Sequence, residues 1–244
     1  MRKRIKINNM NIDYSKISPK LGSWSEDFKP FYEQGGFDEI YKKLKEEGAT
    51  SKILPEGKDL FKAFEKCDKA FLKSIWLGMD PYPTIKYGTI IADGLAFSCS
   101  YTKEEQPSLK LLYNAMEEDL SEGLNLKMPR NTDLSYLAQE GVLLLNSALT
   151  VPERKSGEHK ELWKPFMSYF FNNVVKDLKV PTIFFGRQAQ MYATLYKGPK
   201  MSVEHPVAAS YQQRAFKHEK LFSWTNETLK QQGIREINFL DIPF

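Results

Sequence analysis

Short apolar runs alternate with amphipathic stretches along most of this chain. Residues 75–77, 141–146 and 181–186 are largely apolar, and residues 201–204 form a shorter, weaker run. Runs without polar alternation are typical of buried parallel strands, and the stretches between them have helical spacing. The pattern predicts an α/β fold: a single domain with a central four-stranded parallel twisted sheet, flanked by helices and connected by right-handed crossovers.

The stretches between the predicted strands indicate helices. After Gly35-Gly36, apolar residues recur on one helical face while lysines and glutamates occupy the other. Ser108 is a natural N-cap for a second amphipathic helix. An aromatic-rich helix is expected over about 162–178, and a last helix over about 214–231.

Length and composition fit one ordinary globular domain. The chain has 244 residues, of which 41% are hydrophobic and 27% charged. Residues 1–18 have no clear period, and four of the first six are basic, so we expect a basic, flexible N-terminal arm before a domain at 19–244. No apolar run approaches the roughly 18 residues needed to cross a bilayer, so we expect no membrane association.

The cysteine count and the charge distribution bear on which cofactors and binding partners the protein could have. The two cysteines, Cys67 and Cys99, suggest neither a disulfide framework nor a zinc site, so we expect no metal. The net charge is +4, and between His205 and Arg235 five Lys or Arg stand against two Glu. A basic carboxyl-terminal third would suit a phosphate backbone, although a solvated surface is the commoner explanation of such a bias.

Polar residues follow three of the predicted strands. Asp80 comes two residues after Gly78, Asn146 ends the next strand, and His205 follows the fourth. Since ligands bind at the carboxyl ends of strands in open α/β sheets, these side chains are expected to meet at one edge. Each alone has an ordinary structural explanation, such as capping a turn, but their joint placement favours a functional site.

The three side chains suit a ligand with a flat polar edge. The Asn146 amide offers a donor and an acceptor side by side, as a nucleobase edge requires. Asp80 could orient water or stabilise a positive transition state, and His205 could stabilise negative charge on a leaving group. Tyr82 and Phe97 would form flat apolar walls. No Walker loop, zinc-ligand spacing or G-x-G-x-x-G fingerprint occurs to compete for this edge.

Several segments, in order from about Leu21 to the carboxyl terminus, resemble the family 1 uracil-DNA glycosylases. Residues 78–83 look like the family's water-activating G-Q-D-P-Y-H loop, and 92–98 look like its segment with a base-stacking Phe. Residues 106–110 are similar to its proline-rich DNA-backbone loop, and 141–151 to its uracil-recognition strand. His205-Pro206 stands where its DNA-intercalation loop begins.

This resemblance implies a monofunctional glycosylase without a cofactor. Such an enzyme flips uracil out of DNA, hydrolyses its N-glycosidic bond and leaves an abasic site for base-excision repair. It implies catalytic roles for Asp80 and His205, with His205 as a neutral donor. It implies substrate binding by Gly78, Met79, Tyr82, Phe97 and Asn146. It implies DNA binding by Gln106, Pro107, Ser108, Gly186, Arg187, Pro206, Ala209, Ser210 and Arg214.

Selectivity roles also follow from the resemblance. Asn146 would read the uracil edge against cytosine, and Phe97 would stack on the flipped base. Tyr82 would crowd the 5-position of the base and exclude thymine.

The chain departs from the family pattern at several positions. Met79 replaces a Gln that acts largely through its backbone, and Pro83 replaces a His that helps to hold the attacking water; poxviral members also carry Pro there. Ala209 stands at the place of the leucine wedge, and Arg214 falls one residue later than the family's arginine. A smaller wedge predicts weaker extrusion from duplex DNA and a preference for single strands, unless Tyr211 or Gln212 substitutes.

Two other functions compete with this one. The same fold could act on a 5-substituted uracil, although Tyr82 argues against a bulky substituent. The chain could instead be a DNA-binding replication-accessory protein with weak catalysis, which has no need of Asp80, Asn146 and His205 together. The expected partners are uracil-containing DNA and either a proteinaceous glycosylase inhibitor or replication proteins. We expect a monomer, in the cytoplasm of a bacterium or virus-infected cell, or in the nucleus of a eukaryote.

Overall fold

A four-stranded parallel sheet forms the centre of the molecule. The computed structural model describes residues 12–121 and 127–240. The sheet has the order β5-β2-β7-β8, and each neighbouring pair of strands is parallel, which confirms the predicted α/β architecture. Its strands are β2 (Ser74–Gly78), β5 (Val142–Asn146), β7 (Thr182–Phe185) and β8 (Lys200–Val203).

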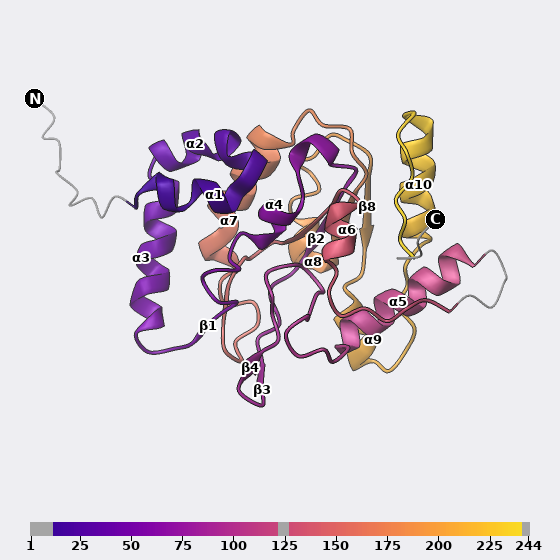
Figure 1. The fold of residues 1–244 in the computed structure, drawn as a ribbon, viewed down its shortest axis with the longest axis horizontal. Coiled ribbons are helices and arrows are strands. Elements are labelled where there is room, and N and C mark those ends of the chain that lie inside the picture. Colours follow the sequence, from indigo (N-terminus) through magenta and orange to yellow (C-terminus); the bar gives the residue numbers. More distant parts are fainter. Residues whose placement is uncertain (1–11, 122–126, 241–244) are drawn as a thin grey trace, which may run out of the picture.

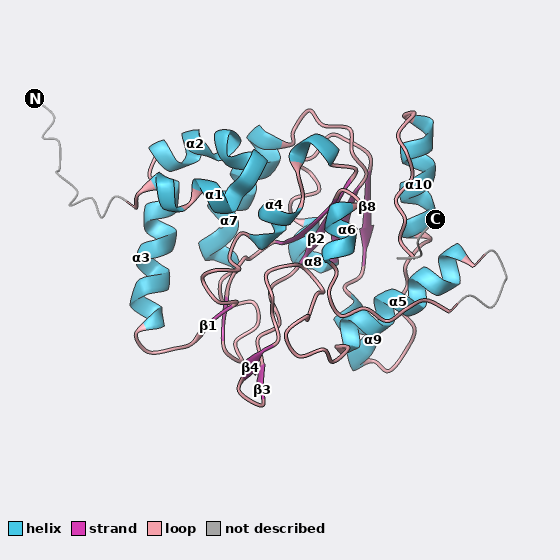
Figure 2. Ribbon diagram, viewed as in Figure 1, coloured by secondary structure: helices cyan, strands magenta, loops and turns pink. Residues whose placement is uncertain are grey.

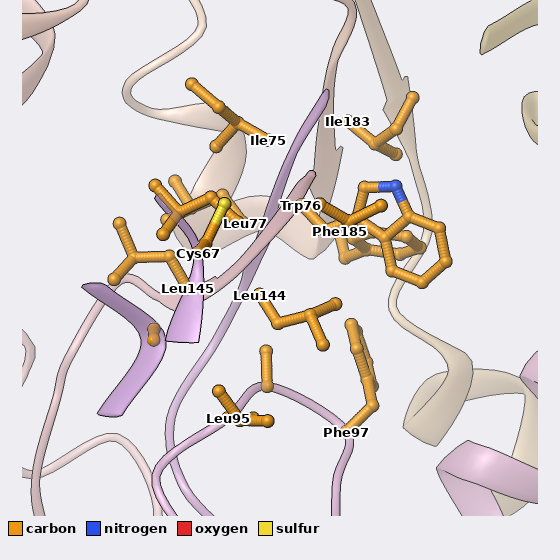
Figure 3. Packing of buried hydrophobic residues seen from close by; sticks show 14 of the residues in the cluster. Cys67, Ile75, Trp76, Leu77, Leu95, Phe97, Leu144, Leu145, Ile183 and Phe185 are labelled. Atoms are coloured by element: carbon orange, nitrogen blue, oxygen red, sulfur yellow. The ribbon is translucent and has the colours of Figure 1, made fainter. Parts of the chain in front are cut away.

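The strands form because their residues are apolar on both faces. Every residue of β2, β5 and β7 is buried, as expected for strands covered on two sides by helices. In Figure 3, Leu77 and Leu145 lie on one side of the sheet, and Trp76 and Phe185 on the other. The ring of Trp76 lies 5.8 Å from that of Phe185 between centroids. The core therefore has two layers, one on each side of the sheet.

Helices cover both sides of the sheet (Figures 1 and 2). On the side of the N-terminus lie α1 (Ser18–Leu21), α2 (Ser25–Glu33), α3 (Gly36–Gly48) and α7 (Lys160–Tyr169). On the opposite side lie α5 (Pro107–Leu120), α9 (Pro206–Tyr211) and α10 (Leu221–Gln231). The shorter α4 (Lys62–Lys66), α6 (Ser135–Gln139) and α8 (Gly186–Gln190) lie nearer the middle. Stacked rings of Phe28 and Phe166, 4.7 Å apart, join α2 to α7.

Two antiparallel pairs of short strands lie outside the main sheet. One joins β1 (Ile53–Leu54) to β6 (Val151–Pro152), and the other joins β3 (Ile85–Lys86) to β4 (Thr89–Ile90). The apolar pattern predicted neither of the strands β3 and β4. The two-residue strands are too short to show an apolar period.

The strand register brings the carboxyl ends of all four strands to one level. Gly78 is paired with Asn146, while Leu77 is paired with Phe184, one residue before the end of β7. Phe185 is in turn paired with Val203, the last residue of β8. The residues that immediately follow these strands therefore share one edge, as the sequence predicted.

Three predicted helix boundaries were wrong. The helix expected to begin after Ser108 begins at Pro107, because proline suits the first helical position, and Ser108 lies inside it. The helix expected over 162–178 is α-helical only to Tyr169 and continues as a π-helical turn, Phe170–Val174. The last helix begins at Leu221 rather than 214, because Gln213, Glu219 and Lys220 adopt positive φ angles that interrupt a right-handed helix.

The predicted N-terminal arm falls into two parts. Residues 1–11 lie outside the described part of the chain. Residues 12–18 are ordered against the domain: Tyr14–Lys16 form a turn of 3₁₀-helix, and Ile17 is buried in the core. This second part is a correction to the predicted arm. None of the helices within 12–121 and 127–240 has the length and apolar run needed to span a membrane.

Candidate active site

The ends of β2, β5 and β8 place a carboxylate, an amide and an imidazole around one small cavity. The described residues that line it are Asp80, Pro81, Tyr82, Ala92, Gly94, Leu95, Phe97, Ser108, Asn146 and His205. The structure thus brings together the residues predicted for catalysis and base recognition. The cavity measures about 20 Å³, enough for about one water molecule.

Asp80 is held at the cavity by a turn that lies far away in the sequence. Its Oδ2 atom accepts a hydrogen bond from the backbone N–H of Gly157 at 2.6 Å and another from Ser156 Oγ at 2.9 Å. Burial raises the pKa of the Asp80 carboxyl, and these two hydrogen bonds oppose that rise. Sequence reasoning missed both donors, because nothing local marks a partner 76 or 77 residues away.

His205 is fixed as a neutral hydrogen-bond donor. It is the N-cap of α9, and its Nδ1 atom accepts the backbone N–H of Val207 at 3.2 Å. The proton of the neutral ring is therefore on Nε2. Burial lowers the pKa of His205 to about 4, so the ring is uncharged at neutral pH. Gly186 at the end of β7 makes room for it, since a Cβ atom there would lie 2.8 Å from His205 Cβ.

Asn146 presents an unused amide to the cavity. It is 8% exposed, and its side chain has no hydrogen-bond partner within residues 12–121 and 127–240. A Cβ atom added to Gly78 would lie only 2.6 Å from Asn146 Oδ1. Gly78 therefore leaves the space that the amide occupies. An amide that lines a cavity and has no protein partner there can bind a ligand through both its donor and its acceptor.

Phe97 and Tyr82 form the apolar walls. The Phe97 ring lies 5.5 Å from the His205 ring and 4.9 Å from the Phe185 ring, between centroids. Phe97 has a φ of +67°, a strained value for a bulky residue and one that functional sites retain. The Tyr82 hydroxyl donates to the Phe97 carbonyl oxygen at 3.1 Å, and burial raises the Tyr82 pKa well above its usual value. The two walls are thus linked.

The backbone around Met79 is tied to the loop after β5. The Met79 carbonyl accepts a hydrogen bond from Ser147 Oγ at 2.7 Å and another from the Ala148 N–H at 3.0 Å. These bonds fix the segment that leads from Gly78 to Asp80.

The residues predicted to contact DNA lie at the beginnings of three helices. Gln106 is the N-cap of α5, Pro107 is exposed, and Ser108 is buried against the cavity. Gly186 begins α8, followed by the exposed Arg187.

The α9 segment differs from what the sequence suggested. Pro206 is buried and Ser210 is partly exposed. Ala209 is 0% exposed, so its side chain does not reach the surface in this structure, whereas Tyr211 is 83% exposed. The position aligned with the family's leucine wedge is thus part of the core, and the next large side chain along the helix is the one displayed.

The Arg214 side chain forms an ion pair with an acidic residue. Both of its terminal nitrogens donate to the carboxylate of Glu204, the residue before His205. This pairing lowers the pKa of Glu204 to about 2. In this structure Arg214 therefore holds the loop after α9 against the end of β8.

Sequence comparisons identify close relatives. No protein-family model matches the chain. The uracil-DNA glycosylase of Amoebophilus asiaticus is 32% identical over 225 residues, which cover 89% of this chain and 97% of that protein. The uracil-DNA glycosylase of Mesomycoplasma hyopneumoniae is 33% identical over 231 residues, which cover 92% of this chain and 98% of that protein.

Solved structures share the fold. The crystal structure of mimivirus uracil-DNA glycosylase matches with a TM-score of 0.81 at 21% identity, covering 95% of this chain and 90% of that one. At 21% identity, the structural similarity supports the fold alone. The two sequence relatives are more than 30% identical over nearly their whole length, and they show the family. This chain belongs to the uracil-DNA glycosylase family.

Proposed function

We propose that this protein excises uracil from DNA by hydrolysing the N-glycosidic bond, and so begins base-excision repair, with Asp80 and His205 as its catalytic residues. The observation that carries the assignment of the site is that the Asn146 amide lines one cavity together with Asp80 and His205. Membership of the family supports the reaction, and the order of motifs fits family 1.

Cleavage of the bond separates charge, and each catalytic residue stabilises one part of it. The sugar acquires oxocarbenium character, and the base leaves as an anion. The ionised Asp80 stabilises the positive sugar and orients the attacking water. His205 donates from Nε2 to the developing negative charge on the uracil oxygen, and its lowered pKa keeps it uncharged beforehand.

Three side chains select the base. Asn146 forms hydrogen bonds to the edge of uracil, whereas the donors and acceptors on the edge of cytosine do not match those of the amide. Phe97 stacks on the flipped ring, and Tyr82 blocks a methyl group at the 5-position. Gly78 and Met79 contribute through their backbone, because Gly78 leaves space for the Asn146 amide and the Met79 carbonyl ties down the loop.

The DNA strand crosses the helix starts described above. Gln106, Pro107 and Ser108 contact the backbone on one side of the flipped nucleotide, and Gly186 and Arg187 contact it on another. The α9 segment of Pro206 and Ser210 faces the gap left by the base, and the exposed Tyr211 is its wedge. Ala209, at the place of the usual leucine, is buried, so Tyr211 must act from a position two residues further along. We therefore propose weaker extrusion from duplex DNA than a leucine wedge would give, and a preference for single strands.

The protein acts as a monomer and is open to inhibition by a protein that covers this face. A crystal structure of a mimivirus UNG variant in complex with UGI, with a TM-score of 0.82 at 21% identity to this chain, supports the second point.

A panel of labelled single-stranded oligonucleotides carrying uracil, thymine or 5-hydroxymethyluracil tests the proposal. Alkali cleaves the strand wherever an abasic site has formed. We expect cleavage at uracil alone. Preference for 5-hydroxymethyluracil would replace uracil as the substrate, and DNA binding without any cleavage would favour an accessory protein.

A further inference from the structure

The hairpin of β3 and β4 ends in an unusual turn. Ile85 pairs with Ile90 and Lys86 with Thr89, so the turn consists of Tyr87 and Gly88 alone. Their φ angles are +48° and +78°, which match the type I′ turn of two-residue hairpins. Such turns favour Asn, Asp or Gly, and a bulky residue at positive φ is strained. Tyr87 is also 90% exposed, so its ring contributes little to the core in return for that strain.

The base of the hairpin is fixed to the wall of the active-site cavity. Ile90 is buried in a small cluster with Leu54, Ala92 and Val151, and Ile85 and Tyr82 pack against this cluster. Tyr82 also lines the active-site cavity. Figure 1 shows the hairpin projecting from the end of the molecule that also carries α9. The ring of Tyr87 is therefore displayed at the tip of a hairpin whose base packs against a wall of the site.

One cationic side chain lies beside this ring, and a second belongs to a residue whose backbone is held near the start of the hairpin. Lys86 Nζ is 5.3 Å from the centroid of the Tyr87 ring, and Lys86 also pairs with Glu104. Arg154 is held next to the hairpin by its backbone N–H, which donates to the Pro83 carbonyl at 2.7 Å. The Arg154 side chain is exposed and 3.5 Å from Glu153. Exposed aromatic rings with basic side chains nearby are typical platforms for unpaired bases, which stack on the ring while the basic groups attract phosphates.

We propose that Tyr87 is a stacking platform for an unpaired base of the strand that carries the uracil, a few nucleotides from the flipped residue. This inference rests on the proposed function, since it extends the path of the same DNA strand. The hairpin would then extend the DNA-binding surface beyond the amino-terminal ends of the helices. Only a DNA strand long enough to reach Tyr87 would use this extension.

The variant Tyr87→Asn separates this function from folding. Asn suits the turn better than Tyr, so the thermal midpoint should stay unchanged or rise. For single-stranded oligonucleotides with uracil near one end and progressively longer flanks, the wild-type KM should fall once the flank reaches the hairpin. In Tyr87→Asn, KM should no longer fall as the flank grows, so on long substrates it should be about fivefold or more above the wild-type KM. Both kcat and the KM for short substrates should stay the same as in the wild type. Tyr87→Trp should restore the dependence on length.

Phe71 provides a matched control. It is also an exposed aromatic residue, 69% accessible, but it lies just before the amino end of β2, away from the carboxyl ends of the strands. Phe71→Ala should leave KM unchanged at every length.

Two results would overturn the inference while leaving uracil excision intact. One is an equal KM for wild type and Tyr87→Asn at all lengths, and the other is a loss that does not depend on length. If the wild type excised no uracil, the proposed function would fail. In that case, the affinities of wild type and Tyr87→Asn for uracil-free single strands would still test the role of Tyr87. Equal affinities would exclude Tyr87 as a stacking platform.

Discussion

Ser156 donates a hydrogen bond from Oγ to Oδ2 of Asp80 across 2.9 Å, although the two residues are 76 positions apart. The same oxygen accepts the Gly157 N–H. Oδ1 accepts no hydrogen bond from residues 12–121 or 127–240, so it can accept one from a water molecule. These donors favour the ionised carboxylate against the burial that raises its pKa. The turn at Ser156 and Gly157 thus sets both the position and the charge of Asp80.

Ser156→Ala should therefore move the pH dependence of excision. Without the hydroxyl, the pKa of Asp80 rises further, so the acid limb of kcat/KM shifts to higher pH. The profile is measured under single-turnover conditions, with Ser51→Ala as the control, since Ser51 is partly exposed and does not line the cavity. An unchanged acid limb in Ser156→Ala would show that this hydrogen bond has no part in activating Asp80.

His205 should remain neutral well below the pH at which an ordinary histidine charges. Its Nδ1 atom accepts the Val207 N–H, and its pKa is lowered to about 4. NMR titration of the ring nitrogens should show the Nε2–H tautomer from neutral pH down to about pH 5. A titration midpoint near the ordinary value of about 6.5 would contradict this prediction.

The same shift has a consequence for stability. Because the folded pKa lies below the unfolded value, the unfolded chain binds more protons between about pH 6.5 and pH 4. His205 therefore contributes a loss of stability as the pH falls through that window. His205→Asn should flatten this part of the stability curve and reduce excision on the order of 10²-fold.

Gly78→Ala should disable base recognition without unfolding the protein. The new methyl group would lie 2.6 Å from Asn146 Oδ1, and the amide, as the end of a side chain, can turn away. We expect kcat/KM for uracil to fall by about 10²-fold or more, since a site built around hydrogen bonds to its substrate depends on them strongly.

Gly48 offers the control, because a Cβ atom added there has no neighbour within 4 Å. Gly48→Ala should leave excision unchanged. Full activity in Gly78→Ala would show that the Asn146 amide does not read the base.

Tyr211→Ala should affect duplex substrates more than single strands. Tyr211 is 83% exposed at the end of α9, and in a duplex the wedge must fill the gap left by the extruded base. Excision from paired and unpaired uracil is compared for wild type and variant. Equal losses on both substrates would exclude Tyr211 as the wedge.

The sequence predicted the sheet and the three side chains at its edge, because both follow from local features. A fully apolar run identifies a buried strand, and the polar residue after it lies at the carboxyl end. The turn of Ser156 and Gly157 could not be predicted in this way, since its partner is distant in the chain.

Two other features were missed for different physical reasons. The hairpin at Tyr87 was missed because its strands have two residues each, although Gly88 was a signal for a turn. Ala209 was expected to face DNA because of its place in a motif, but the orientation of α9 buries it. That orientation depends on packing against α5, which no local pattern shows.

Asp80→Asn tests the central claim most directly. Single-turnover excision from a uracil-containing single strand is measured for wild type, Asp80→Asn and the surface variant Asp177→Asn, with DNA affinity determined in parallel. The account predicts that Asp80→Asn binds the DNA but loses excision on the order of 10²-fold or more, while Asp177→Asn matches wild type. Excision by Asp80→Asn at the wild-type rate would contradict the assignment of the active site.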